Sequence, residues 1–381
     1  MVTSAMTATT FLRGYLGYLK GDGWDVTLIC SEGPGIEELV SDAGVTLVKL
    51  EMRREPSLLH DLGSLIGAVR VMRKLRPDVL VYATPKAALV GAVSGWISRV
   101  PTRAYELWGL RLETATGLAR IVFWILETMT MRLSTVVIAN SRSMAARADE
   151  LRLSKGRALS VLGPGSSHGV DADYFSRSAE MPKLSADLAD RLSDEGVPVV
   201  GFIGRMHPDK GIDVLITALR ICADRGHGAQ LLIVGSDEGA QVATVIKGAG
   251  GAVRVHAIGF SRDIRPMLKA MDILVLPSLR EGFPNVVLEA AAMEVPAIVS
   301  DATGCIDAVI DGVTGQVVPV GDPVALADAI VKMLADDSGR KVMGAAGRLR
   351  AVTQFAPATI WSLHSEAWRE AANLIKKSAM Q

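Results

Sequence analysis

The sequence predicts an α/β protein built from two doubly wound parallel-sheet domains. The chain has 381 residues, more than one hydrophobic core usually serves. Short β-branched runs alternate with helical patterns along its whole length, and these runs are continuously apolar instead of apolar at every second residue. Such strands are buried on both faces, which is typical of parallel sheets covered by helices.

The first half contains a long helical pattern at 58–75 and an earlier one at Thr10–Lys20. Almost no strand precedes that earlier helix, although the first strand of a doubly wound sheet is usually central. We therefore expect either a start upstream of Met1 or a first strand shortened to "MVTS". The apolar runs that predict strands in this half are 24–30, 45–50, 78–84 and 135–140.

A polar segment without a β run, 175–196, separates the halves and is predicted to be a linker with one short helix. The tail, 358–381, is predicted to be a helix whose apolar face packs back on the first domain. The predicted domains are 1–174 and 197–357, with ligands beyond the carboxyl ends of the strands, in a cleft between the domains. The runs that predict strands in the second half are 197–204, 229–235, 252–259, 272–278 and 296–300.

Composition narrows the class of protein. Lys+Arg and Asp+Glu are both 41, so the chain has no basic excess for nucleic acid. Cys30, Cys222 and Cys305 have no metal-ligand spacing and fit a reducing compartment. The first residues lack a signal-peptide pattern, and no run reaches the roughly 20 apolar residues of a membrane span. We expect a cytoplasmic protein that touches the membrane, at most, at its cytoplasmic face.

The stretch "VVGFIGRMHPDKGIDVLITAL" joins a buried strand to an amphipathic helix. The strand ends at Gly204, the loop carries Arg205 and Lys210, and the helix opens near Gly211. Fixed cations beside a helix N-terminus favour a diphosphate. The alternative is a pair of solvated loop charges, which are common in such loops.

A second stretch, "LREGFPNVVLEAA", carries Glu281 and Glu289 on either side of a turn. Gly282 and Pro284 place Glu281 in the loop, with Pro284 as the first helical residue. Glu289 then lies about 7–8 Å further along the helix axis, among apolar neighbours. The two carboxylates therefore cannot share one helix face. The alternatives are an exposed helical glutamate and a strand-end loop charge.

The segments "GRMHPDKG" and "EGFPNVVLEAAAMEVPAIVSDATGCIDAVIDGVTG" closely resemble the retaining glycosyltransferases of family four. The E-x7-E pair is the hallmark of that family, and "GSSHGVDADYF" (165–175) also fits. The resemblance implies a GT-B fold, in which two Rossmann-like domains face a central cleft. It covers nearly the whole chain and is looser in the first half. There, "TPKAALVG" and "GLRLETATG" are similar to enzymes that make bacterial surface polysaccharides or lipid-linked oligosaccharides.

By this resemblance, the donor is a nucleotide-diphosphate sugar, with UDP expected, and no cofactor is used. Arg205 and Lys210 would hold the diphosphate and stabilise its growing charge, and Glu281 would bind the donor sugar. Glu289 would bind the ribose hydroxyls. The sugar would be transferred with retention of configuration, by a front-face reaction that needs no carboxylate nucleophile. The further donor-binding residues would be Gly14, Gly204, Gly259, Phe283, Pro284, Asn285 and Val286.

The chain departs from the family pattern in the first domain. Trp108 precedes Gly109 where many members carry a histidine that touches the donor sugar, so Glu106 or Arg111 is a candidate substitute. His168 stands where similar proteins often carry asparagine. In the second domain "TGCID" replaces G-G-x-x-E, with Asp307 for the glutamate.

The acceptor, a saccharide or a polyprenyl-linked saccharide, is expected on the first domain. Lys86, Trp108, Arg111 and His168 are the acceptor-side candidates. Basic residues and the run "IVFWIL" (121–126) could also dock an anionic membrane, whereas the plainer interpretation is a core-packed helix with solvated arginines. The basic residues in question are Arg53, Arg54, Arg111 and Arg120.

No metal site is expected, because "DAD" at Asp171–Asp173 lies in a turn before the linker and no cluster has ligand spacing. Two other classes stay open beside the glycosyltransferase. One is a GT-B epimerase or hydrolase acting on sugar nucleotides, which would lack this E-x7-E context. The other is an inactive sugar-nucleotide-binding partner, which the intact charged set disfavours.

Overall fold

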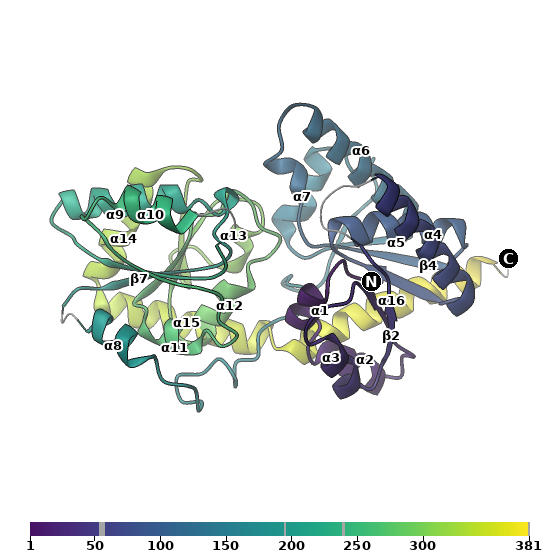
Figure 1. Ribbon diagram of the computed structural model, residues 1–381, viewed down its shortest axis with the longest axis horizontal. Helices are drawn as coiled ribbons and strands as arrows, with labels where there is room; N and C mark the ends of the chain where they lie inside the picture. The colour runs from purple at the N-terminus through teal and green to yellow at the C-terminus, as the bar shows by residue number, and fades with distance from the viewer. Residues whose placement is uncertain (53–57, 194–195, 238–240, 380–381) are drawn as a thin grey trace. The chain divides into compact units, whose positions relative to one another are not determined.

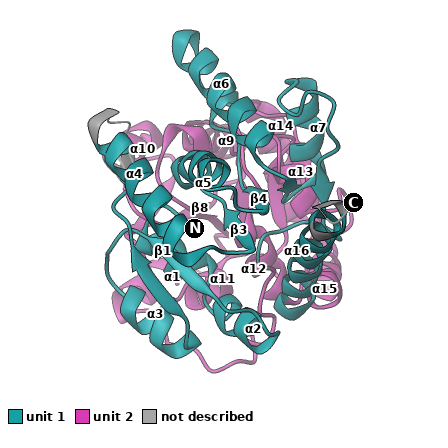
Figure 2. Cartoon of the chain, turned by 90° about the vertical axis from the view of Figure 1, so that its right-hand side faces the viewer, with its two compact units in different colours: residues 1–168, 357–381 teal, residues 169–356 magenta. Residues whose placement is uncertain are grey.

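The computed structural model describes residues 1–52, 58–193, 196–237 and 241–379. The chain divides into two units, drawn in different colours in Figure 2. Unit 1 consists of Met1–His168 with Pro357–Gln381, and unit 2 of Gly169–Ala356. Each unit has parallel strands with helices between them, so the predicted fold class of two Rossmann-like domains is confirmed. Arg53 and Arg54 lie outside the described residues.

In unit 1, one parallel sheet has the order β3-β4-β5-β6, and a second pair has the order β1-β2. Residues 1–3 lie between these two sheets. The Val2 amide donates to the Ile29 carbonyl at 3.1 Å, and the Ala83 amide donates to the Met1 carbonyl at 3.4 Å. The "MVTS" segment thus has the central position expected of a shortened first strand. The strands are β1 (Thr27–Cys30), β2 (Thr46–Lys49), β3 (Val79–Tyr82), β4 (Thr102–Leu107), β5 (Val136–Ala139) and β6 (Ser160–Val161).

The prediction of one helix over Thr10–Lys20 is wrong, because two helices occupy this region. The first helix ends at Phe11 with Leu12 as its C-cap, and Gly14, whose φ is +74°, is the N-cap of the second. The long helical pattern at 58–75 was predicted with its observed bounds. The helices of unit 1 before the linker are α1 (Ala5–Phe11), α2 (Tyr15–Gly21), α3 (Ile36–Ala43), α4 (Leu58–Leu75), α5 (Pro85–Ile97), η1 (Arg111–Glu113), α6 (Gly117–Leu133) and α7 (Arg142–Glu150).

The sheet of unit 2 is fully parallel and has the order β12-β11-β10-β7-β8-β9. Helices lie on both sides of β7 within this unit (Figure 1). Its strands are β7 (Val199–Ile203), β8 (Gln230–Val234), β9 (Arg254–Ile258), β10 (Ile273–Leu276), β11 (Ala297–Ser300) and β12 (Gly315–Val318). Its helices are α8 (Ala186–Leu192), η2 (Pro208–Lys210), α9 (Ile212–Asp224), α10 (Gln241–Ala249), α11 (Arg265–Ala270), α12 (Asn285–Ala292), α13 (Cys305–Ala308), α14 (Pro323–Ala335) and α15 (Asp337–Gln354).

The boundaries between the units in the sequence differ from the predicted boundaries. Residues 169–174 group with unit 2, because the Val170 amide donates to the Phe355 carbonyl at 2.8 Å and Arg348 donates to the Ala172 carbonyl at 3.3 Å. The predicted linker contains α8 and also groups with unit 2.

Helix α16 (Pro357–Ala379) is the last element of the chain and groups with unit 1. Trp361 stacks on Tyr15 of α2, with ring centroids 5.6 Å apart. Trp368 is buried and donates from Nε1 to Glu106 on β4 at 3.1 Å. A segment from the far end of the chain thus covers one side of the unit 1 sheet.

Candidate active site

The loops that follow β7 and β10 meet at one edge of the unit 2 sheet, because these two strands are neighbours in it. Gly211 ends the first loop with a φ of +66°, and a Cβ there would lie 2.1 Å from the Pro277 carbonyl oxygen. Only glycine permits this close approach of backbones. The amide of Leu279 then donates to the carbonyl of Asp209 at 2.8 Å and ties the loops together.

Lys210 and Glu281 meet at the junction of these loops. Lys210 Nζ donates to Glu281 Oε1 at 2.6 Å, and Ser278 Oγ donates to the same oxygen at 2.8 Å. Ser278 is fully buried and its carbonyl accepts from Ser300 Oγ. The two charged side chains are mostly buried, with 14% and 15% exposed. The structure thus brings together one predicted diphosphate ligand and the predicted sugar ligand.

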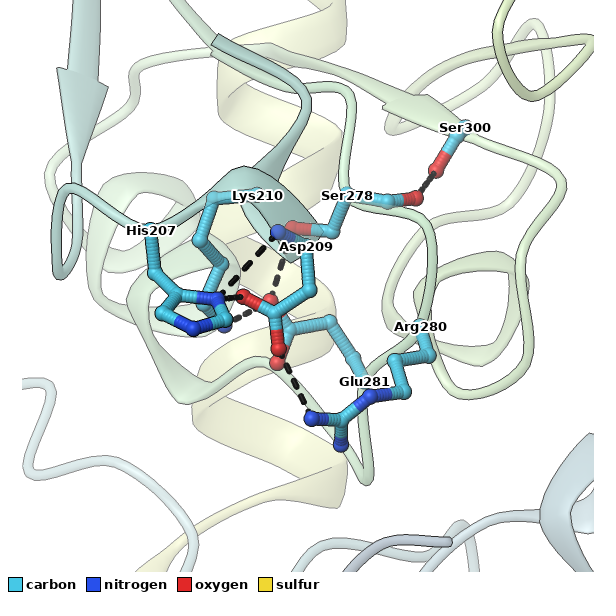
Figure 3. A network of polar contacts seen from close by, with 7 residues as sticks. All are labelled: His207, Asp209, Lys210, Ser278, Arg280, Glu281 and Ser300. Atoms are coloured by element: carbon cyan, nitrogen blue, oxygen red, sulfur yellow. Dashed lines mark hydrogen bonds and ion pairs between the residues drawn. The ribbon is translucent and has the colours of Figure 1, made fainter. Parts of the chain in front are cut away.

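A second ion pair runs beside the first (Figure 3). Arg280 Nη2 donates to Asp209 Oδ2 at 2.8 Å, and His207 Nδ1 lies 2.6 Å from Asp209 Oδ1. Burial alone would raise the pKa of Asp209, but Arg280, Lys210 and His207 together lower it. Sequence reasoning missed Asp209 and Arg280. The dipeptides "DK" and "RE" could have indicated this pairing, because each carries one acidic and one basic residue, in opposite order.

Helix α12 starts after Pro284 with no side-chain cap, so its first N–H groups have no partner from a capping residue. Asn285 Nδ2 donates to the Gly169 carbonyl at 3.3 Å, and Phe283 is buried against Phe355 with ring centroids 5.5 Å apart. Val286 is partly buried on the first turn of the helix. The prediction that Pro284 is the first helical residue is wrong, because Pro284 is the cap that precedes the helix.

Glu289 lies one turn into α12 and is partly buried. Burial raises the pKa of its carboxyl group to about 7. Among the described residues, none donates a hydrogen bond or forms an ion pair with this carboxyl group. Glu281 and Glu289 are thus held differently, the first by Lys210 and the second without a side-chain partner in the described chain.

The loop of "TGCID" closes over the Glu281 loop. The Glu281 amide donates to the Thr303 carbonyl at 2.9 Å, and a Cβ on Gly304 would lie 2.3 Å from the Gly282 carbonyl oxygen. Asp307 lies beyond this contact on α13, and its carbonyl accepts from Arg350 at 2.8 Å.

The other predicted donor residues of unit 2 lie at strand ends. Gly204 donates to the Val234 carbonyl at 2.9 Å, and Arg205, which is partly buried, follows it directly. Gly259 follows β9 and is exposed. Gly204 and Arg205 therefore share the β7 loop with Lys210, whereas Gly259 lies two strands away in the sheet order.

In unit 1, Trp108 and His168 are joined through Phe11, a residue that sequence reasoning missed. Phe11 stacks on Trp108 with centroids 5.3 Å apart and contacts His168 edge-on at 5.1 Å. His168 Nδ1 lies 2.9 Å from Ser167 Oγ. Burial, with a smaller effect from His364, lowers the pKa of His168 to about 4. His168 is therefore neutral near pH 7.

Glu106 is wrong as a candidate substitute for the missing family histidine. It is buried on β4, and its Oε1 accepts from Trp368 at 3.1 Å and lies 3.0 Å from His364 Nδ1. Burial lowers the pKa of His364, but the Glu106 carboxylate outweighs this and the net shift is upward. Glu106 thus holds α16 on the sheet of unit 1.

The remaining candidates of unit 1 lie elsewhere. Lys86 Nζ pairs with Asp61 on α4 at 2.7 Å, and the Arg111 guanidinium lies 5.2 Å from the centroid of the Phe123 ring on α6. Gly14 is exposed at the start of α2, where a Cβ would lie 2.9 Å from the Trp361 ring.

The part of the chain that the structure describes contains no group of three or more His, Cys, Asp or Glu placed to hold a metal ion. Asp171 instead accepts the amides of Asp173 and Tyr174 at 3.1 and 2.9 Å, which closes a turn. No helix within the described ranges has the length and apolarity that crossing a membrane requires.

Comparison with known proteins shows the family of this chain. The family described as "Glycosyl transferases group 1" matches residues 197–336, and the "Glycosyl transferase 4-like domain" matches residues 7–165. The capsular polysaccharide biosynthesis glycosyltransferase CapM of Staphylococcus aureus is 33% identical over 357 residues, 92% of this chain and 91% of CapM. A UDP-Gal:α-D-GlcNAc-diphosphoundecaprenol α-1,3-galactosyltransferase of Escherichia coli is 24% identical, over 88% of this chain and 87% of that enzyme.

Among solved structures, HepE of Anabaena with UDP and glucose superposes with a TM-score of 0.77 at 20% identity, over 97% of this chain and 99% of that one. This likeness and the two parallel-sheet units show the GT-B fold, and the family matches together with CapM show that the chain is a glycosyltransferase. With the sequence relatives, the chain belongs to glycosyltransferase family four, which confirms the resemblance carried by the E-x7-E pair.

Proposed function

We propose that this glycosyltransferase moves a hexosyl or N-acetylhexosaminyl group from a UDP-sugar to a saccharide or polyprenyl-diphosphate-linked acceptor, with retention of configuration. The names of CapM and of the E. coli galactosyltransferase support a role in surface polysaccharide or glycoconjugate assembly. The UDP complexes of HepE support a uridine donor. The observation that carries the proposal is the Lys210–Glu281 pair at the start of α12.

In this proposal, Lys210 and Arg205 bind the diphosphate and stabilise the negative charge that develops as the glycosidic bond breaks. Lys210 has three N–H donors, so it can keep Glu281 as a partner while it contacts a phosphate oxygen. Glu281 then accepts hydroxyl groups of the sugar, and the uncapped start of α12 faces the diphosphate. Glu289 accepts the ribose hydroxyls, and the leaving phosphate helps to deprotonate the acceptor.

The proposed acceptor side is unit 1, where Trp108, His168 and Phe11 form a cluster of partly exposed aromatic rings, a type of side chain that can stack on sugar rings. Helix α6 has an exposed apolar stripe, which supports contact with a lipid-linked acceptor at the cytoplasmic face of a membrane. Lys86 and Arg111 remain proposed acceptor ligands.

We further propose that the transfer needs no metal, because Arg205 and Lys210 supply the cationic charge that a divalent ion supplies elsewhere. Activity measured with a chelator in excess is expected to equal activity in its absence. A loss that added Mg²⁺ or Mn²⁺ restores would contradict this part of the proposal.

The first test is a thermal-shift screen of UDP, GDP and ADP and their sugar derivatives. A donor at roughly 100 times its dissociation constant adds about 2.7 kcal/mol to the free energy of unfolding, a readily visible shift. Stabilisation by GDP or ADP alone would contradict the uridine assignment. Sugar release without transfer, or isomerisation of the donor, would favour the hydrolase or epimerase alternative.

The second test uses Lys210→Ala and Glu281→Gln, each measured for transfer with the identified donor. Each should lose activity by about tenfold to a hundredfold, the scale of one positioned electrostatic contact. Lys247→Ala and Glu294→Gln are matched controls, since both side chains are exposed in unit 2. Near-wild-type activity in both test variants would reject the site, and binding without turnover in the wild type would favour an inactive partner.

A further inference from the structure

Two ion pairs connect the same two loops. One loop carries an acidic residue followed by a basic one, and the other loop carries them in the reverse order. The β7 loop carries Asp209 followed by Lys210, and the β10 loop carries Arg280 followed by Glu281. Asp209 pairs with Arg280 at 2.8 Å, and Lys210 pairs with Glu281 at 2.6 Å (Figure 3). We call these four residues the crossed ion pairs. Their formal charges cancel, so the network is neutral before any ligand binds.

Asp209 is the most buried member of the crossed ion pairs. Its side chain is 6% exposed, whereas that of Arg280 is 20% exposed. A buried carboxylate needs a partner, because desolvation without one is costly. Lys210 is adjacent to Asp209 in sequence and close enough to lower the pKa of the Asp209 carboxyl group. Asp209 could therefore attract Lys210 if Arg280 were absent.

The pairing of Asp209 therefore bears on where Lys210 points. With Arg280 on Oδ2 and His207 on Oδ1, both carboxylate oxygens of Asp209 already have partners. Lys210 is then held by Glu281 Oε1, which the buried Ser278 hydroxyl also fixes. With the Asp209–Arg280 pair in place, each of the two carboxylates has its own cation.

We propose that Asp209 and Arg280 are positioning residues of the donor site, which keep Lys210 directed at Glu281 and at the donor diphosphate. Neither residue needs to touch the donor. The proposal rests on the proposed function, because it takes Lys210 to be a diphosphate ligand. It predicts that Arg280 matters chiefly through the charge of Asp209.

The test compares Arg280→Gln with the double variant Asp209→Asn/Arg280→Gln. Binding of the nucleoside diphosphate that stabilises the wild type in the thermal screen is measured by isothermal titration. In Arg280→Gln, Asp209 Oδ2 loses its partner and competes for Lys210, so affinity should fall by about tenfold, the scale of one misplaced ligand. In the double variant the side chain at position 209 is an uncharged amide that does not compete, so most of that loss should be recovered. Arg280→Lys, which keeps the charge, should bind nearly as the wild type does.

Arg225→Gln is the matched control. Arg225 pairs with Asp328 at 2.5 Å on the surface of unit 2, so its loss removes one ion pair outside the donor loops. Circular dichroism and thermal unfolding of every variant show whether it is folded at the titration temperature. Steady-state kinetics should show a raised KM for the donor in Arg280→Gln, with the KM restored in the double variant.

Two outcomes would overturn the inference: wild-type affinity in Arg280→Gln, or a double variant that binds as weakly as Arg280→Gln or more weakly. Failure of the proposed function can be distinguished from failure of this inference. If the proposed function is wrong, either Lys210→Ala binds the diphosphate as the wild type does, or no nucleoside diphosphate binds. Either result removes the basis of the inference as well. Loss in Lys210→Ala with no change in Arg280→Gln rejects the positioning role alone.

Discussion

At the scale of single residues, Glu289 has a raised pKa and is also the proposed ligand of the ribose. Its pKa is raised to about 7 by burial, and within the described chain no side chain neutralises it. Without donor, its contribution to the free energy of unfolding is greatest below the ordinary glutamate pKa and falls as pH rises through about 7. The ionised form is the better acceptor for ribose hydroxyls, so donor binding and proton release should be linked.

We expect UDP binding to release a proton at about pH 6 and to tighten as pH rises through about 7, because the bound state favours ionised Glu289. Isothermal titration in two buffers of different ionisation enthalpy measures this release. Glu289→Gln should abolish the difference between buffers, whereas Glu294→Gln at the exposed end of the same segment should keep it. Proton uptake in the wild type, or an unchanged buffer dependence in Glu289→Gln, would count against the ribose contact.

At the scale of elements, helix α6 carries the run "IVFWIL" and has two different faces. Phe123 and Trp124 pack on the core of unit 1, and Trp124 donates to the Leu151 carbonyl at 2.9 Å. The outward face carries Leu118, which is 81% exposed, with Ile121, Val122 and Ile125, each about half exposed. These four positions follow helical spacing and form one stripe. The interpretation as a core-packed helix is thus confirmed for the inward face, whereas membrane contact of the outward face stays a prediction.

The double variant Ile121→Asn/Ile125→Asn should bind vesicles containing anionic phospholipid about tenfold more weakly, because it removes apolar surface from the stripe. Vesicle flotation measures this, and added salt should weaken wild-type binding since Arg120 and Arg111 are exposed beside the stripe. Val342→Asn is the control, because Val342 is exposed to a similar degree in unit 2. Equal flotation of the double variant and the wild type would exclude the stripe as the membrane contact.

At the scale of the whole molecule, the chain forms two units of which the first is discontinuous. Unit 1 needs α16, whose Trp368 and His364 both reach the buried Glu106 carboxylate. Removing either partner leaves a buried charge with fewer hydrogen bonds, and removing the Trp368 ring also leaves a cavity. The stability of unit 1 therefore depends on residues at both ends of the chain.

Trp368→Ala should lower the free energy of unfolding of unit 1 by about 3–5 kcal/mol, the usual cost of truncating a buried aromatic ring. Hydrogen exchange followed by mass spectrometry should show faster exchange in β3–β5 and little change in the sheet of unit 2. Trp96→Ala is the control, because Trp96 in the same unit is 58% exposed. Exchange that rises equally in both units would show that they do not unfold separately.

The sequence by itself determined the fold class, most strands and the positions of Glu281 and Glu289 on either side of a helix start. Apolar runs, glycines and prolines act over a few residues, so these features are local. It missed β4, β6 and β12. Arg103 and Glu106 interrupt the apolar run of β4, Gly315 and Gln316 weaken that of β12, and β6 has only two residues. It also missed the break at Gly14, because the helical pattern continues across it.

Only the tertiary structure decided which charges are partners. Asp209 and Arg280 are 71 residues apart in the chain, and Glu106 and His364 are 258 apart. No local pattern links such residues, because their contact depends on which strands become neighbours in the sheet and on where the last helix packs. For the same reason the sequence indicated Glu106 as a candidate site residue, whereas the fold buries it under α16. The sequence contains the charged dipeptides "DK" and "RE", but only the adjacency of β7 and β10 in the sheet determines that they pair.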